Sequence, residues 1–201
     1  MIKVMALMGC KDSDAYLQAS LYAYKLEPSA DAAVGCAAMA FKKGDIDGSV
    51  KFFDEAINLE TDNAKKADNA YKAASVLASA KKLSQARSYA QKAISFNENF
   101  GAPYILIAQL YAGNYKWNDE PALNKCTFFA AIDKLQRAKA VDPSVAEEAN
   151  KLISSYSAYT PEAKDLFMLG YKAGDRITIG GWIGERSEEH TSELQSQQPI
   201  A

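Results

Sequence analysis

Histidine, cysteine and long apolar runs are scarce in this sequence, and each shortage excludes a class of protein. The chain has one histidine and three cysteines in 201 residues. The cysteines Cys10, Cys36 and Cys126 lie far apart and form no CxxC pair, which fits neither a disulfide framework nor a zinc site. No apolar run approaches the roughly 18 residues that a membrane span needs. We therefore expect no membrane span, no metal site and no cofactor.

A charge excess of one sign is also missing. The 23 Lys and Arg residues and the 25 Asp and Glu residues are mixed along the chain and give a formal net charge of -2. Because no basic stripe is available to attract phosphates, nucleic acid is not an expected partner. Hydrophobic residues make up 48% of the chain, enough to bury the core of a single globular or repeat domain.

The segment 29–60 has the pattern of one helix-turn-helix unit. Its first half carries small residues at helical spacing, namely Ala33, Cys36, Ala37 and Ala40. Gly44 and Asp45 interrupt the helix. The second half has an apolar face of its own, formed by Ser49, Phe53, Ala56 and Ile57. Comparable units follow at 67–98 and 101–143, so the chain is predicted to be a row of helix pairs.

These units resemble the tetratricopeptide repeat (TPR), which has a period of roughly 34 residues. The resemblance implies an all-α fold, an α-α superhelix or TPR-like solenoid of antiparallel helix pairs. We expect an incomplete N-terminal repeat at 1–28, because residues 15–28 already have the pattern of a closing repeat helix. TPR-like repeats with capping helices are expected over 29–174. The unit 101–143 departs from the period through an insertion around 113–124.

Several local signals place elements after the insertion. The run from Asn118 to Pro121 has a polar cap followed by proline and predicts a helix that continues to Val141. Two further helices are expected from about Ser144 and Thr160, and they resemble a last repeat or a capping pair that closes the stack. At 175–185 the pattern alternates and predicts a short extended or β-hairpin segment.

The last part of the chain, 186–201, is polar and predicted to be a disordered tail. Its run RSEEHTSELQS resembles the in-frame translation of a sequencing-library adapter, which would place the natural C-terminus near Glu185. The only histidine, His190, lies in this run. The natural part then has no imidazole for acid-base catalysis, a nucleophilic triad or metal binding. We expect no catalytic residues and no enzyme.

The TPR resemblance also indicates where a partner would bind. Fixed positions of each first helix line a concave groove in that family, and the matching residues are partner-binding candidates. They are Val34, Phe41, Lys42, Asp68, Tyr71, Ser75, Ile105 and Gln109. This mixed, mostly small lining favours an extended or helical apolar segment of a protein or peptide. Family members that clamp the carboxylate tails of chaperones carry Lys and Asn where this chain has residues such as Val34 and Asp68, so no such clamp is expected.

The insertion loop offers a second candidate contact. Tyr115 and Trp117 form an aromatic pair on an irregular segment, a common setting for a binding residue. The competing interpretation is that Trp117 covers the helix ends as packing.

Two functions remain after these exclusions. The first is a noncatalytic protein-protein interaction scaffold that binds its ligand in the groove. The alternative is a truncated regulatory or assembly domain of a larger bacterial envelope protein, with its activity upstream of Met1. The segment 175–185 weakly resembles the ends of secreted repeat proteins from Bacteroidetes-type bacteria. That resemblance indicates a bacterial source and a periplasmic location, with a cytoplasmic location as the alternative.

Overall fold

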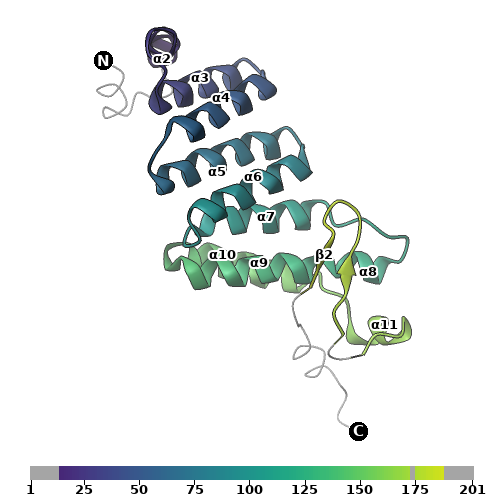
Figure 1. Ribbon diagram of the computed structural model, residues 1–201. Helices are drawn as coiled ribbons and strands as arrows, with labels where there is room; N and C mark the ends of the chain where they lie inside the picture. The colour runs from purple at the N-terminus through teal and green to yellow at the C-terminus, as the bar shows by residue number, and fades with distance from the viewer. Residues whose placement is uncertain (1–13, 173–174, 188–201) are drawn as a thin grey trace. The chain divides into compact units, whose positions relative to one another are not determined.

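The computed structural model describes residues 14–172 and 175–187. The chain divides into two compact units, Met1–Phe100 and Gly101–Ala201, and each is described by itself. Within the described ranges the chain is all-α apart from one short β-hairpin (Figure 1).

The first unit consists of helices that pack on their neighbours in chain order. They are α2 (Asp14–Leu26), α3 (Ala30–Lys42), α4 (Ile46–Leu59), α5 (Asn63–Ser79) and α6 (Leu83–Phe96) (Figure 1). Each helix contacts the next one along the chain. The closing helix predicted at 15–28 corresponds to α2, and the helix pairs predicted at 29–60 and 67–98 are α3–α4 and α5–α6. Residues 1–13 of the expected incomplete repeat lie outside the described ranges.

Short polar side chains define where these helices begin. The Ser29 hydroxyl accepts a hydrogen bond from the Ala32 N–H, and the Asp45 carboxylate accepts one from the Gly48 N–H at 2.9 Å. Asp62 caps α5 in the same way. Each cap satisfies backbone N–H groups that have no partner inside the helix. The predicted break at Gly44 is present, and its φ of +79° is a left-handed value that suits glycine.

Alanine side chains let the helices of the first unit approach closely. Ten alanines on α3 to α6 have no exposed surface: Ala33, Ala37, Ala56, Ala67, Ala70, Ala73, Ala74, Ala86, Ala90 and Ala93. Between α2 and α3 the approach is closer still. A Cβ added to Gly35 would lie 2.1 Å from the Ser20 Oγ and 2.3 Å from the Ser20 Cβ. The small-residue pattern of the sequence is therefore a packing pattern.

Polar bridges connect alternate helices of the same unit. The Tyr24 hydroxyl on α2 donates to the Glu55 carboxylate on α4. The Tyr89 hydroxyl on α6 donates to Asp54 on α4 at 2.6 Å, and Lys92 Nζ approaches the same carboxylate at 3.1 Å. Burial, together with the bond to Asp54, raises the pKa of Tyr89. The alternation of tyrosine and acid thus ties α2 to α4 and α4 to α6.

Ser49 carries a hydroxyl with no partner in the core of the first unit. Its side chain has no exposed surface, and its Oγ makes no hydrogen bond within the described residues. Burying a hydroxyl without a partner costs roughly 1–3 kcal/mol. We therefore predict that Ser49→Ala raises the free energy of unfolding by about 1 kcal/mol. Urea unfolding followed by circular dichroism measures the change. Ser154→Ala, at an exposed position on α10, is the neutral control, and a lower midpoint for Ser49→Ala would contradict the prediction.

The second unit surrounds one central helix pair. Its helices are α7 (Gly101–Gly113), α8 (Pro121–Lys125), α9 (Thr127–Val141), the 3-10 helix η1 (Pro143–Val145), α10 (Ala146–Ser157) and α11 (Ala163–Met168). Helices α7 and α10 both pack on α9. Helix α11 contacts α8, and its buried Leu166 joins Cys126 and Phe129 in one apolar cluster. Of the two last helices, predicted as a last repeat or a capping pair, α10 packs on α9 and α11 lies at the end of the central pair where α9 begins.

The helix predicted from the insertion to Val141 is divided in two. Its start lies within the predicted run from Asn118 to Pro121, because Pro121 opens α8 and the Glu120 side chain caps it by accepting from the Ala122 N–H. The chain then turns at Cys126 before α9 begins. The Thr127 hydroxyl donates to the Tyr115 carbonyl at 3.2 Å, which ties the first turn of α9 to the insertion loop. This contact between distant positions is absent from the local pattern.

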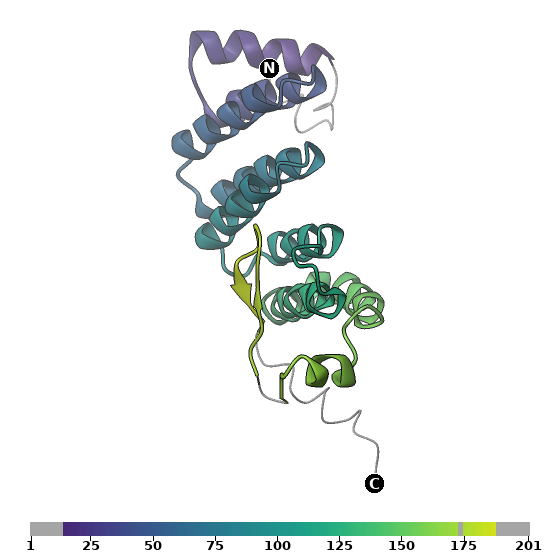
Figure 2. The same cartoon turned by 90° about the vertical axis from the view of Figure 1, so that its right-hand side faces the viewer.

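The predicted hairpin is present at the C-terminal side of the second unit. Strand β1 (Thr178–Ile179) pairs antiparallel with β2 (Glu185–Arg186). Ile179 and Ile183 are buried, and Trp182 packs edge-on against Tyr111 of α7 with ring centroids 5.6 Å apart. The Ser187 N–H donates to the Ile177 carbonyl at 3.0 Å, so the ladder continues beyond the expected boundary at 185. Figure 2 shows the hairpin on one side of the α7–α9 pair and α10 on the other.

Candidate partner-binding surface

The candidate residues on α3 differ in how far they are exposed. Val34 is half-buried and packs on the core cluster that contains Ala37 and Phe53. Phe41 lies in the last turn of α3, and 44% of its surface is exposed. Lys42 beside it is exposed as well. An exposed apolar ring and an exposed lysine side chain are therefore neighbours at the C-terminal end of α3.

The candidate residues on α5 are half-buried and partly engaged within the unit. The Asp68 carboxylate forms an ion pair with Lys72 one turn later, at 2.5 Å. The Tyr71 ring packs edge-on against Phe100 with centroids 5.3 Å apart. The Ser75 hydroxyl donates to the Tyr71 carbonyl one turn earlier, at 3.0 Å, so it is bonded to the backbone of its own helix. Among these side chains Tyr71 offers the largest apolar surface.

Helices α3 and α5 share one core cluster although α4 separates them in the sequence. Ala37 of α3 and Ala73 and Val76 of α5 pack around Phe53 of α4, and Val34 covers the edge of this cluster. Of the candidates, Val34 packs on this cluster, and Tyr71 packs on a second cluster formed by Ile57, Ala70 and Ala93. The remaining candidates, Ile105 and Gln109, lie on α7 of the second unit. Ile105 is 4% exposed and Gln109 is exposed.

The side chain of Asn124 holds the insertion loop together, and the sequence did not single this residue out. The Asn124 side-chain oxygen accepts hydrogen bonds from the N–H groups of Trp117 and Asn118 at 2.7 and 2.8 Å. Its amide group donates to the Asn118 carbonyl at 2.7 Å. An asparagine in a polar insertion is an ordinary loop residue, so no sequence signal marks this role.

The two loop aromatics both contact the second unit. Tyr115 is half-buried and lies beside Phe128, with ring centroids 5.5 Å apart. Trp117 is half-buried against the hairpin, and a Cβ added to Gly180 would lie 2.7 Å from its ring. Trp117 therefore packs on the hairpin, and part of its side chain is exposed. Its role as a partner contact stays a prediction.

Two cysteines lie in the described part of the chain. Cys36 and Cys126 are free and buried, and burial raises their pKa values to about 11 and about 12, so both stay protonated at neutral pH. Within residues 14–172 and 175–187, no three His, Cys, Asp or Glu side chains are grouped to hold a metal ion. His190 lies outside these ranges. In the same part of the chain, no helix combines the length and apolar character needed to cross a membrane.

Comparison with known proteins shows a structural similarity that concerns the fold. No protein-family model matches the sequence, and no curated protein matches it. Among solved structures, the chain is similar to the crystal structure of MamA, with a TM-score of 0.53 and 15% sequence identity. The match covers 85% of this chain and 95% of that chain. Identity at this level concerns the fold alone, and the fold is the predicted all-α, TPR-like solenoid with a short hairpin.

Proposed function

We propose that this protein is a noncatalytic interaction scaffold that binds a segment of another protein on the surface formed by α3 and α5. The observation that carries the proposal is the exposed ring of Phe41. The other apolar residues of α3 are buried or half-buried, whereas Phe41 keeps 44% of its surface exposed. Helical repeat proteins use extended surfaces of this kind to hold partners.

The chemistry of this surface fits an apolar segment with a polar border. Phe41 and Tyr71 supply aromatic area, while Val34 on α3 and Ser75 on α5 are small enough to admit a partner backbone. Lys42 is exposed and Asp68 half-buried at the edge, where charges of opposite sign set orientation more than affinity. A helix or extended strand with alternate apolar residues matches this arrangement.

A capture experiment tests this proposal. The full chain of residues 1–201 is used as bait in a bacterial lysate beside a Phe41→Ala, Tyr71→Ala variant. Burying one large apolar side chain contributes roughly 1.5–3 kcal/mol, so the variant should bind at least about tenfold more weakly. We omit Ile105 from the variant because it is buried, and its replacement would disturb the core.

The matched control removes equally exposed apolar groups elsewhere. Phe167 and Met168 on α11 are 73% and 85% exposed, and Phe167→Ala, Met168→Ala should leave capture unchanged. Circular dichroism of each variant verifies that it is folded. Equal capture by the bait and the Phe41, Tyr71 variant would show that the partner binds elsewhere.

A further inference from the structure

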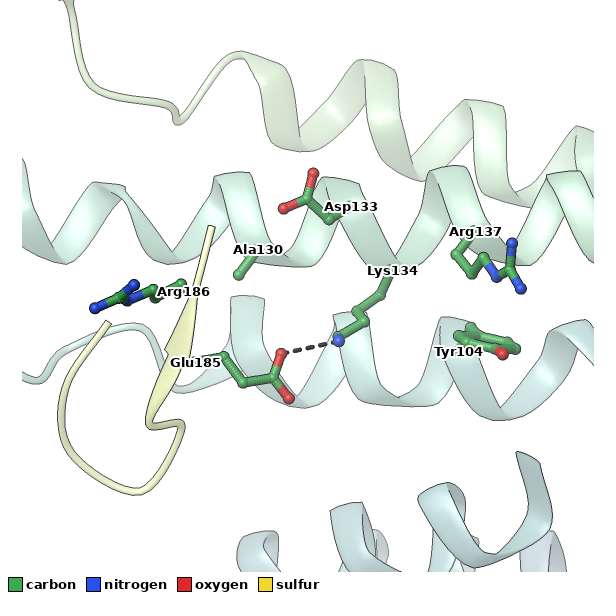
Figure 3. Close-up of a pocket in the computed structure, with 7 residues that line it drawn as sticks. All are labelled: Tyr104, Ala130, Asp133, Lys134, Arg137, Glu185 and Arg186. Atoms are coloured by element: carbon green, nitrogen blue, oxygen red, sulfur yellow. Dashed lines mark ion pairs between the residues drawn. The ribbon is translucent and has the colours of Figure 1, made fainter. Parts of the chain in front are cut away.

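A pocket in the second unit shares no residue with the surface proposed above. It has a volume of about 420 Å³ and is formed by α7, α9 and the hairpin (Figure 3). Its lining residues are Tyr104, Ala130, Asp133, Lys134, Arg137, Glu185 and Arg186. Three cations and two carboxylates therefore surround one cavity.

One cation of this pocket has an ion-pair partner within the chain, and another has none among the described residues. Lys134 Nζ lies 2.8 Å from the Glu185 carboxylate, and these side chains are 28% and 23% exposed. Arg137 follows one turn later on α9, and Figure 3 shows it beside the Tyr104 ring. Within the described parts of the chain, no ion pair engages the Arg137 guanidinium. Lys134 therefore already has a carboxylate partner in Glu185, whereas Arg137 has no ion-pair partner among the described residues.

The hairpin adds an open strand edge beside the same pocket. Within residues 14–172 and 175–187, β2 pairs only with β1. The Ser187 N–H points towards β1, because it donates to Ile177. Hydrogen-bonding groups alternate along an antiparallel strand, so the N–H and carbonyl of Arg186 point away from β1. Figure 3 shows β2 between the hairpin loop and the side chains of Lys134 and Tyr104.

We propose that an extended acidic segment of a partner protein adds to the open edge of β2 and places a carboxylate side chain in the pocket beside Arg137. The backbone of the segment bonds to the N–H and carbonyl of residue 186. An arginine guanidinium holds a carboxylate through two parallel hydrogen bonds, and the Tyr104 hydroxyl is a further donor at the same end of the pocket.

The proposal applies to the chain of residues 1–201, because the strand edge it uses lies at Arg186, the first residue of the adapter-like run. The edge is formed by the backbone of that position and not by its side chain. Arg137 and Tyr104 lie on α9 and α7. None of these residues belongs to the α3–α5 surface, so the outcome here is independent of the proposed function.

Fluorescence anisotropy with the full chain tests the acidic preference. The probe is a fluorescein-labelled peptide, capped at both ends, with alternating valine and glutamate, in buffer with about 50 mM salt to limit screening. We expect saturable binding that Arg137→Glu weakens about tenfold or more. Lys125→Glu makes the same charge change at an exposed position outside the pocket and should alter affinity less than about twofold.

Two further probes separate the parts of the proposal. The same peptide with lysine for glutamate should not bind saturably, and methylation of its central backbone amides should remove binding if strand addition occurs. Equal affinity of the acidic peptide for the natural chain and Arg137→Glu would overturn the proposal. Absence of saturable binding by the acidic peptide would overturn it too.

Discussion

Replacing Gly35 by leucine is expected to separate α2 from the rest of the first unit. The backbone of Gly35 is so close to α2 that a Cβ would already overlap Ser20. Tyr16 and Leu17, both 4% exposed, pack with Met39 of α3 and depend on this spacing. Overpacking at a tight helix contact typically costs 1–3 kcal/mol or more, and we expect about 3 kcal/mol here. Urea unfolding gives the loss, and limited proteolysis locates it in α2.

A reciprocal exchange checks the cause of this effect. Removing the Ser20 side chain makes room on the opposite helix, so Ser20→Gly combined with Gly35→Ser should recover most of the stability that Gly35→Ser alone loses. Gly113→Ala is the control for adding a side chain to a helical glycine, because nothing lies within 4 Å of its added Cβ. Equal stability of Gly35→Leu and the natural chain would show that α2 is not held by this contact.

Truncation of Trp182 is expected to release the hairpin from the second unit. A two-stranded piece is marginally stable alone, so its order must come from docking. Trp182 packs on Tyr111, and the hairpin isoleucines Ile179 and Ile183 are buried. Because Trp182 is only half-buried, we expect Trp182→Ala to cost about 2 kcal/mol, less than the 3–5 kcal/mol of a fully buried ring.

Hydrogen-deuterium exchange distinguishes release of the hairpin from general destabilisation. The Ser187 N–H is bonded to the Ile177 carbonyl and should exchange slowly in the natural chain. In Trp182→Ala the peptide covering 175–187 should lose protection, while peptides from α9 keep theirs. Arg176→Ala, at an exposed position before β1, is the control. Unchanged protection in Trp182→Ala would mean that backbone pairing alone maintains the hairpin.

The repeat pattern predicted the first unit well because its helices are defined by local signals. The alanine stripes, the break at Gly44 and the caps at Ser29 and Asp45 all act within a few residues of their position in the chain. Packing between neighbouring helices then follows from the same residues. The hairpin was also visible in the sequence, because alternating isoleucines and a Gly-Gly pair are local features.

The second unit was harder to predict because distant residues decide its details. The turn at Cys126 follows a helix signal and depends on the tie between Thr127 and Tyr115 across the insertion. Leu166 of α11 packs with Cys126 and Phe129, a contact that no spacing rule indicates. The same limit applies to the candidate site, since helical position alone did not separate the buried Ile105 from exposed neighbours.

The central claim is that a partner segment binds across α3 and α5. Site-specific photo-cross-linking tests it most directly, with a benzoylphenylalanine placed at Lys42 beside the exposed Phe41 ring and, as the control, at the exposed Lys51 of α4. The account predicts a discrete cross-linked partner from position 42 that is lost when Phe41 is replaced by alanine, and none from position 51. A partner cross-linked equally from both positions, or one that persists in the Phe41→Ala chain, would contradict it.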